Sequence, residues 1–197
     1  MNAVLPDLAA QGAFHPVRMA AHADGLDVVH EPGVDLAIWD RPLSGTVDLP
    51  PAWAEREALR AEATVPDARG LVLDRWGPGA DSLARDVGRL AQAFGSVAGA
   101  DRGQVRLEVL DHDACRRWHV DYKRLRLLCT YAGPGTLWCA RGEDGGVQAV
   151  GRQRRLSVGI YKGLLYPGGP SGRLLHRSPR IAAAGRRRLA LCIDAAV

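Results

Sequence analysis

The residues best suited to chemistry in this sequence are two histidines and one aspartate. His119 and Asp121 stand two positions apart in Trp118-His119-Val120-Asp121, and His176 follows fifty-five residues after Asp121. Two imidazoles and one carboxylate form the 2-His-1-carboxylate triad that holds non-haem Fe(II) and leaves coordination positions open. Residues two apart in a strand point to the same face, so His119 and Asp121 can reach one ion while His176 approaches from another strand. We therefore predict that these three residues bind a metal and form the catalytic centre.

The residues after Asp121 extend this face if the strand continues. With unbroken alternation, the face of His119 and Asp121 runs on through Lys123 to Tyr131. We therefore expect Tyr131 to look toward the metal and to help bind a cofactor.

Two arginines near the C-terminus are candidates for holding an anionic cosubstrate. An Fe(II) oxygenase that uses 2-oxoglutarate needs a cation for the distal carboxylate, and arginine offers the best bidentate geometry. Arg186 and Arg188 lie ten and twelve residues after His176. We prefer Arg188, because it lies deeper in an apolar strand and shares a face with Ala190 and Cys192, and we keep Arg186 as the second candidate. A purely solvent-facing role for both arginines stays open.

The order His-x-Asp, then His, then a basic residue about ten positions later resembles the 2-oxoglutarate/Fe(II) dioxygenase superfamily. This resemblance implies Fe(II) and 2-oxoglutarate as cofactors and hydroxylation as the reaction.

A second metal arrangement is also possible. Asp111, His112, Asp113 and Cys115 precede His119, and cysteine and histidine at a four-residue spacing suit zinc. A structural zinc site needs four closed ligands, and no second paired set is present. Cys115, Cys129 and Cys192 are therefore expected to be small buried apolar side chains.

The secondary structure that must position these residues is predicted to change from short strands and helices in the N-terminal half to strands in the C-terminal half. Leu26–Val29 and Val34–Trp39 have the composition of short strands, and Pro51 opens a stretch of helix formers that reaches about Ala63. Asp81–Val97 places apolar residues at helical spacing. Beyond residue 103 the period becomes two, and we predict strands at Gln104–Leu110, Lys123–Tyr131, Leu156–Tyr161, Gly172–His176 and Arg188–Ile193.

This order predicts an α+β fold. We expect a cupin-like double-stranded β-helix, or jelly roll, in the C-terminal half, with N-terminal helices packed on it. Residues 1–197 are expected to form a single domain. Within it, residues 1–24 are poorly ordered or loosely packed, residues 25–102 form a helix-rich support, and residues 103–197 form the β-rich metal-binding core.

Composition limits the possible partners. The chain has 197 residues, 47% of them hydrophobic, and a formal charge of +4. The basic residues at 152–155 and 186–188 could face solvent or, as a minor alternative, bind nucleic acid. Only 6% of residues are aromatic, so few side chains could stack on the bases of a single strand. The four cysteines form no CxxC pair, and no signal peptide or membrane-spanning run is apparent. We therefore expect a cytoplasmic protein. We also expect its substrate to be a small molecule or a peptide.

Several longer motifs resemble an uncharacterised bacterial family, domain-of-unknown-function family 1826. They are Leu36–Leu43, Cys115–Asp121, Arg124–Thr136 and His176–Pro179. The family has no established reaction, but some members lie in zinc-responsive gene neighbourhoods, which implies a link to metal supply.

Three hypotheses follow. The first is an Fe(II)/2-oxoglutarate-dependent oxygenase. The second is a non-catalytic, cupin-like protein that binds zinc or another metal in bacterial metal homeostasis. The third is an interaction module without a metal, in which the histidines are incidental.

Overall fold

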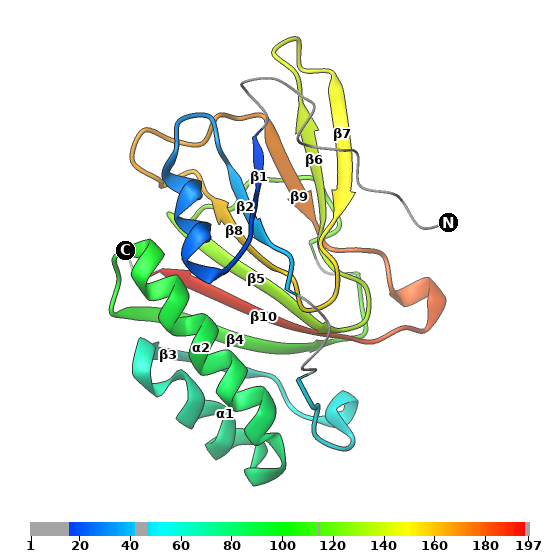
Figure 1. Ribbon diagram of the computed structural model, residues 1–197. Coiled ribbons are helices and arrows are strands. Elements are labelled where there is room, and N and C mark those ends of the chain that lie inside the picture. The colour runs from blue at the N-terminus through cyan, green and yellow to red at the C-terminus, as the bar shows by residue number, and fades with distance from the viewer. Residues whose placement is uncertain (1–15, 42–46, 114, 196–197) are drawn as a thin grey trace.

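The computed structural model describes residues 16–41, 47–113 and 115–195 (Figure 1). The strands in these ranges are β1 (Val17–Ala20), β2 (Leu36–Trp39), β3 (Leu59–Thr64), β4 (Arg102–Leu110), β5 (Leu125–Ala132), β6 (Leu137–Arg141), β7 (Val147–Arg152), β8 (Val158–Lys162), β9 (Leu174–Arg177) and β10 (Arg188–Ala195). The α-helices are α1 (Ala68–Trp76) and α2 (Asp81–Ala98). Short 3-10 helices are η2 (Ala23–His30), η3 (Trp53–Glu55), η4 (Val65–Asp67), η5 (Pro78–Ala80) and η6 (Ala182–Ala184).

The strands form two sheets. The larger has seven strands in the order β1-β2-β8-β5-β10-β4-β3, and the smaller has three in the order β7-β6-β9. Within the larger sheet β1 runs parallel to β2, while the other neighbouring strands pair antiparallel. The chain therefore has a mixed α+β fold that is mostly β-sheet, as the sequence predicted.

Helices cover one face of the seven-stranded sheet (Figure 1). The stripe predicted on α2, which includes Leu83, Val87, Leu90 and Phe94, is buried against this face. The residues of β5 and β10 that meet it are the odd-numbered ones, such as Leu127. Alternation along each strand sends the even-numbered residues to the opposite face, which is the face that carries the candidate site.

The small sheet packs on that opposite face, over the β1-β2-β8 side. Trp138 and Ala140 of β6 and Leu174 of β9 contact Leu36 of β2 and Tyr161 of β8 in a second apolar cluster. The β10-β4-β3 side of the same face carries polar residues instead, because the small sheet does not reach it.

The N-terminal half differs most from the sequence-based prediction. Leu26–Val29 was predicted as a strand but lies within the 3-10 helix η2. The helix predicted from Pro51 to Ala63 is also wrong, because Leu59–Thr64 forms β3 and pairs with β4. Residues 1–15 lie outside the described part of the chain. The loose packing expected up to residue 24 is contradicted at Val17, which is buried in β1.

The described helices include none that is both long enough and apolar enough to span a bilayer.

Candidate metal centre

His119 and His176 are held opposite each other by a short antiparallel bridge. The backbone N–H of each donates to the carbonyl of the other at 3.0 Å. The imidazole centroids lie 4.5 Å apart, and one possible ligand atom from each of His119, Asp121 and His176 falls within 4.8 Å of the other two. The structure thus brings together the three residues predicted as metal ligands.

The hydrogen bond of His119 determines which of its nitrogens is available. Its Nδ1 lies 2.8 Å from the carbonyl oxygen of Arg117 and can only donate to it, so Nδ1 carries a proton and, in the neutral ring, Nε2 keeps a lone pair. The hydrogen bond with Asp121 raises the pKa of His119, and partial burial opposes this effect. Metal-binding histidines commonly have one ring N–H fixed in this way. Burial lowers the pKa of His176, and the nearby Asp121 only partly offsets the effect, so His176 is neutral near pH 7.

Asp121 is buried and its two oxygens have different surroundings. Arg126 donates to Oδ1. Oδ2 lies 3.0 Å from His176 Nε2, but no N–H in the described residues is aligned on it. Burial acts to raise the pKa of Asp121, yet the two imidazoles and the Arg126 charge outweigh it and hold this pKa far below its usual range. His119 Nε2 lies 3.5 Å from Oδ1. An ionised, buried carboxylate beside two imidazole nitrogens, with one oxygen that has no aligned donor among the described residues, fits a divalent metal ion.

Arg126 also joins Asp121 to a second carboxylate. Its Nε and Nη2 donate to Asp194 of β10 at 2.6 and 2.9 Å. Arg106 adds a third hydrogen bond to Asp194 at 3.1 Å. The position of the Asp121 carboxylate is therefore fixed through Arg126 to the main sheet.

Arg188 is buried on the same face of β10 and is surrounded by hydroxyl groups. Its guanidinium donates to Thr130 and Thr136 at 2.9 and 2.8 Å, with a longer contact to Ser178 at 3.4 Å. It forms no ion pair with any carboxylate in the part of the chain that the structure describes. Burial lowers its pKa, since a charged group without a counter-ion is costly inside a protein.

Tyr161 packs against His176. Its ring centroid is 4.7 Å from that of His176. Burial raises its pKa, while the charges of Arg188 and Asp121 act on it in opposite directions. Both charged residues are therefore close to the same phenol. Arg186, the second candidate anchor, is exposed and does not approach this group.

The prediction that Tyr131 faces the metal is wrong. Residues 122–124 bend before β5 begins at Leu125, so the alternation from His119 is interrupted. Tyr131 instead lies on the helix-covered face and donates to Asp86 of α2 at 2.9 Å.

The second metal arrangement is not assembled. Asp113 accepts the backbone N–H groups of Ile181 and Ala182 at 2.7 and 3.0 Å. Cys115 is exposed, contrary to prediction, while Cys129 and Cys192 are buried as expected. In the described ranges, the triad is the only cluster of three or more His, Cys, Asp or Glu residues close enough to share an ion.

Residues 20–194 match the family model described as "Protein of unknown function (DUF1826)". The chain belongs to this family. The matched range of this DUF1826 protein contains the triad, Arg126, Arg188 and Asp194. A search among curated proteins found no match.

The DUF1826 chain also has a limited likeness to several solved structures. One is a dioxygenase for auxin oxidation from rice, with 15% identity and a TM-score of 0.49 over 88% of this chain and 62% of the rice chain. This chain thus spans less than two thirds of that protein. A Pseudomonas putida prolyl-4-hydroxylase has 15% identity and a TM-score of 0.46, over 88% of this chain and 98% of the other. The dioxygenase for auxin oxidation 1 from Arabidopsis thaliana, in a 2-oxoglutarate complex, has 15% identity and a TM-score of 0.48 over 79% and 68%.

Sequence reasoning missed the residues that support the triad. Arg126 and Asp194 are paired by the register of β5 and β10, and Thr130 and Thr136 meet Arg188 only after folding. The one sequence signal for Arg126 was its place among apolar residues in a predicted strand, where a buried charge needs a partner.

Proposed function

We propose that this chain is a non-haem Fe(II) oxygenase that depends on 2-oxoglutarate. His119 Nε2, Asp121 Oδ2 and His176 Nε2 would hold the metal. The observation that carries the proposal is the convergence of these three residues: one possible ligand atom from each lies within 4.8 Å of the other two, and Asp121 Oδ2 is buried and receives no aligned N–H from the described residues. Two imidazoles and one carboxylate are the donor set that leaves open positions on Fe(II).

Arg188 narrows the proposal to 2-oxoglutarate. A protein that only stores metal has no use for a buried guanidinium without a carboxylate partner, whereas a dicarboxylate cosubstrate would supply that partner. Arginine binds a carboxylate in a bidentate way, and the hydroxyls of Thr130 and Ser178 can add further donors. Arg188 would therefore anchor the distal carboxylate.

When bound, Fe(II) and 2-oxoglutarate would activate O₂, which is the oxidant that hydroxylates a substrate, and 2-oxoglutarate would supply the other two electrons. The protein's own part is binding and shielding. The low pKa of Asp121 keeps this carboxylate ionised, Arg126 holds its Oδ1, and the Arg117 carbonyl fixes the His119 ring. Tyr161 and the fully buried Trp138 keep water away from one side of the centre.

We further propose that the two sheets form a cupin-like double-stranded β-helix within a single domain spanning residues 1–197. The small sheet faces the β1-β2-β8 side of the large one across an apolar cluster, which supports this reading. The main core combines residues from Leu26 to Ala195, which supports one folding unit.

The test is an anaerobic titration of Fe(II)-loaded protein with 2-oxoglutarate. We expect saturable binding with the visible charge-transfer absorption of a metal-chelating 2-oxo acid. His176→Ala should abolish the absorption, while Arg186→Met, which changes an exposed arginine two residues before Arg188, should leave it unchanged. Retention of Zn(II) through dialysis without any 2-oxoglutarate binding would reject the oxygenase and leave the zinc-binding alternative.

A further inference from the structure

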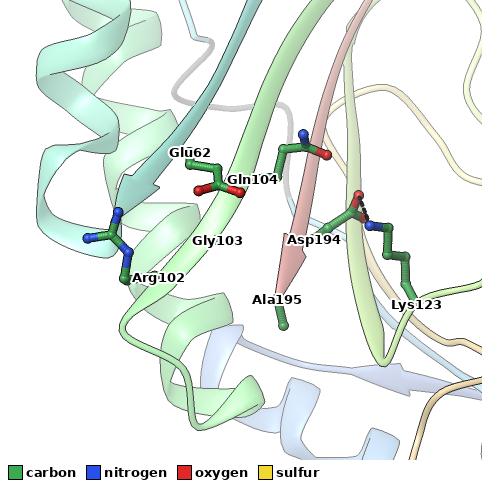
Figure 2. Close-up of a pocket in the computed structure, with 7 residues that line it drawn as sticks. All are labelled: Glu62, Arg102, Gly103, Gln104, Lys123, Asp194 and Ala195. Atoms are coloured by element: carbon green, nitrogen blue, oxygen red, sulfur yellow. Dashed lines mark ion pairs between the residues drawn. The ribbon is translucent and has the colours of Figure 1, made fainter. Parts of the chain in front are cut away.

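A polar cavity opens on the metal-bearing face of the large sheet, at the ends of β3, β4 and β10 (Figure 2). Its volume is about 260 Å³. The residues that line it are Glu62, Arg102, Gly103, Gln104, Lys123, Asp194 and Ala195. This volume lies just below the range of about 300–1,000 Å³ that is usual for small-molecule pockets, which suits a small ligand better than a peptide.

Strand register places one row of polar side chains across this face. Glu62 lies opposite Gln104, and Gln104 lies opposite Asp194. Asp194 in turn lies opposite Arg126. Directly opposite residues in neighbouring strands point to the same side, so the row runs from the sheet edge to the residue that holds Asp121.

The side chains in this row differ in how many hydrogen bonds and ion pairs they already make. Asp194 is buried and is already occupied by Arg126 and Arg106. Glu62 and Gln104 are exposed and line the cavity, and neither side chain makes a hydrogen bond or ion pair with the described residues. Glu62 therefore offers a free carboxylate at one side of a hollow.

Two cations complete the lining. The Lys123 ammonium has only a distant contact with Asp194 Oδ2, at 4.0 Å. Arg102 forms no ion pair with the residues that the structure describes. In Figure 2 the Glu62 and Arg102 side chains stand toward one side of the view, while Lys123 and Asp194 stand toward the other. The cavity thus presents one free acid and two weakly engaged bases.

We propose that this cavity binds a small zwitterion with an ammonium and a carboxylate, of the α-amino acid class. Glu62, helped by the Gln104 amide oxygen, accepts the ammonium, and Arg102, which stands on the same side of the view as Glu62 in Figure 2, binds the carboxylate. Both contacts are charge-assisted hydrogen bonds, the stronger kind. The site goes beyond the proposed oxygenase and rests on the cavity alone, although the Asp194–Arg126 pair places it one side chain away from the metal ligand Asp121.

The test is a thermal-shift screen of the full chain with the common L-α-amino acids, followed by calorimetric titration of the best probe. Acetate and methylammonium serve as half-probes. We expect at least one amino acid to bind with a Kd of about 1 mM or tighter, and neither half-probe to do so. Glu62→Gln and Arg102→Met should each weaken binding by about tenfold or more, because each removes a charge-assisted contact.

Glu143→Gln, which changes an exposed glutamate in the β6–β7 turn, is the matched control and should bind like the wild type. The proposal is overturned if no amino acid binds, if acetate binds as well as the amino acid, or if Glu62→Gln has no effect. No Fe(II) or 2-oxoglutarate is added, so failure here leaves the oxygenase proposal standing, and failure of that proposal leaves this one standing.

Discussion

Arg188 is a buried cation whose side-chain hydrogen bonds, among the described residues, are all to neutral hydroxyls. Such a group normally requires a counter-ion, because an unpaired charge in the interior is costly. If 2-oxoglutarate supplies it, Arg188→Met should weaken 2-oxoglutarate binding by about ten- to a hundredfold, the loss of one charged hydrogen-bonding partner. Arg188→Lys should recover part of this, since it restores the charge without the bidentate fork.

Calorimetric titration of the metal-loaded variants measures the effect. Metal affinity should not change, because Arg188 makes no contact with the triad. If Arg188→Met and the wild type bound 2-oxoglutarate with equal affinity, Arg188 would not be a ligand of 2-oxoglutarate.

Arg126 has a different role, since it touches the metal ligand Asp121 rather than a ligand from solution. Its charge is compensated by Asp194, so its main effect is to hold Oδ1 while Oδ2 stays 3.0 Å from His176 Nε2. Partners that orient metal ligands are typically worth about ten- to a hundredfold in metal affinity. We therefore expect Arg126→Gln to weaken Zn(II) binding by about this factor, and Arg126→Lys to weaken it less.

A competition titration against a chromophoric chelator measures this affinity, with circular dichroism confirming that the variants fold. If charge repulsion between Arg126 and the metal dominated, Arg126→Gln would bind Zn(II) more tightly. That result would contradict the positioning role.

Among the connecting elements, the turn after β8 supports the segment that carries Asp121. Gly163 donates its N–H to the Arg124 carbonyl, and a Cβ on Gly163 would lie 2.0 Å from the Lys123 carbonyl oxygen. The backbone must therefore move if residue 163 gains a side chain. We expect Gly163→Ala to destabilise the protein by about 1–3 kcal/mol, as overpacking does, and to weaken metal binding as well.

Chemical denaturation and the same chelator competition measure the two effects. Gly79→Ala is the control, because an added Cβ there meets nothing within 4 Å. A Gly163→Ala variant with unchanged metal affinity would show that the turn does not position Asp121.

The elements that could be predicted from sequence are those whose own pattern agrees with their packing. The helical stripe of α2 and the alternation of β10 needed no distant information. By contrast, Leu59–Thr64 contains good helix formers and becomes a strand because it can pair with β4 and bury Leu59 and Ala63. β6 and β7 were not predicted, and together with β9 they form the small sheet.

The same distinction applies to the site. The triad was predicted because histidine and aspartate at that spacing are informative by residue type. Tyr131 was assigned to the wrong face because a bend at residues 122–124 changes the phase of the strand, and sequence alternation alone does not reveal a bend. Arg126 and Asp194 gain their role from strand register, which is a property of the folded sheet.

At the scale of the whole molecule, the triad joins separate parts of the fold. His176 lies on β9 in the small sheet, Asp121 is tied through Arg126 to β10 in the large sheet, and His119 lies in the segment between β4 and β5. A metal bound by all three would oppose separation of the sheets. Because such a site does not exist in the unfolded chain, metal binding should stabilise the folded state.

At a metal concentration about a hundred times the Kd, the stabilisation is about 2.7 kcal/mol. For a chain of this size, each kcal/mol raises Tm by about 2–4 °C, so Mn(II), as a redox-stable substitute for Fe(II), should raise Tm by about 5–11 °C. Differential scanning fluorimetry with and without Mn(II) measures the shift, and excess EDTA should reverse it. His176→Ala should remove the shift entirely, whereas His112→Ala, which changes an exposed histidine outside the triad, should retain it. A shift that persists in His176→Ala would mean that the ion binds elsewhere, and no shift in the wild type would contradict a metal site that links the two sheets.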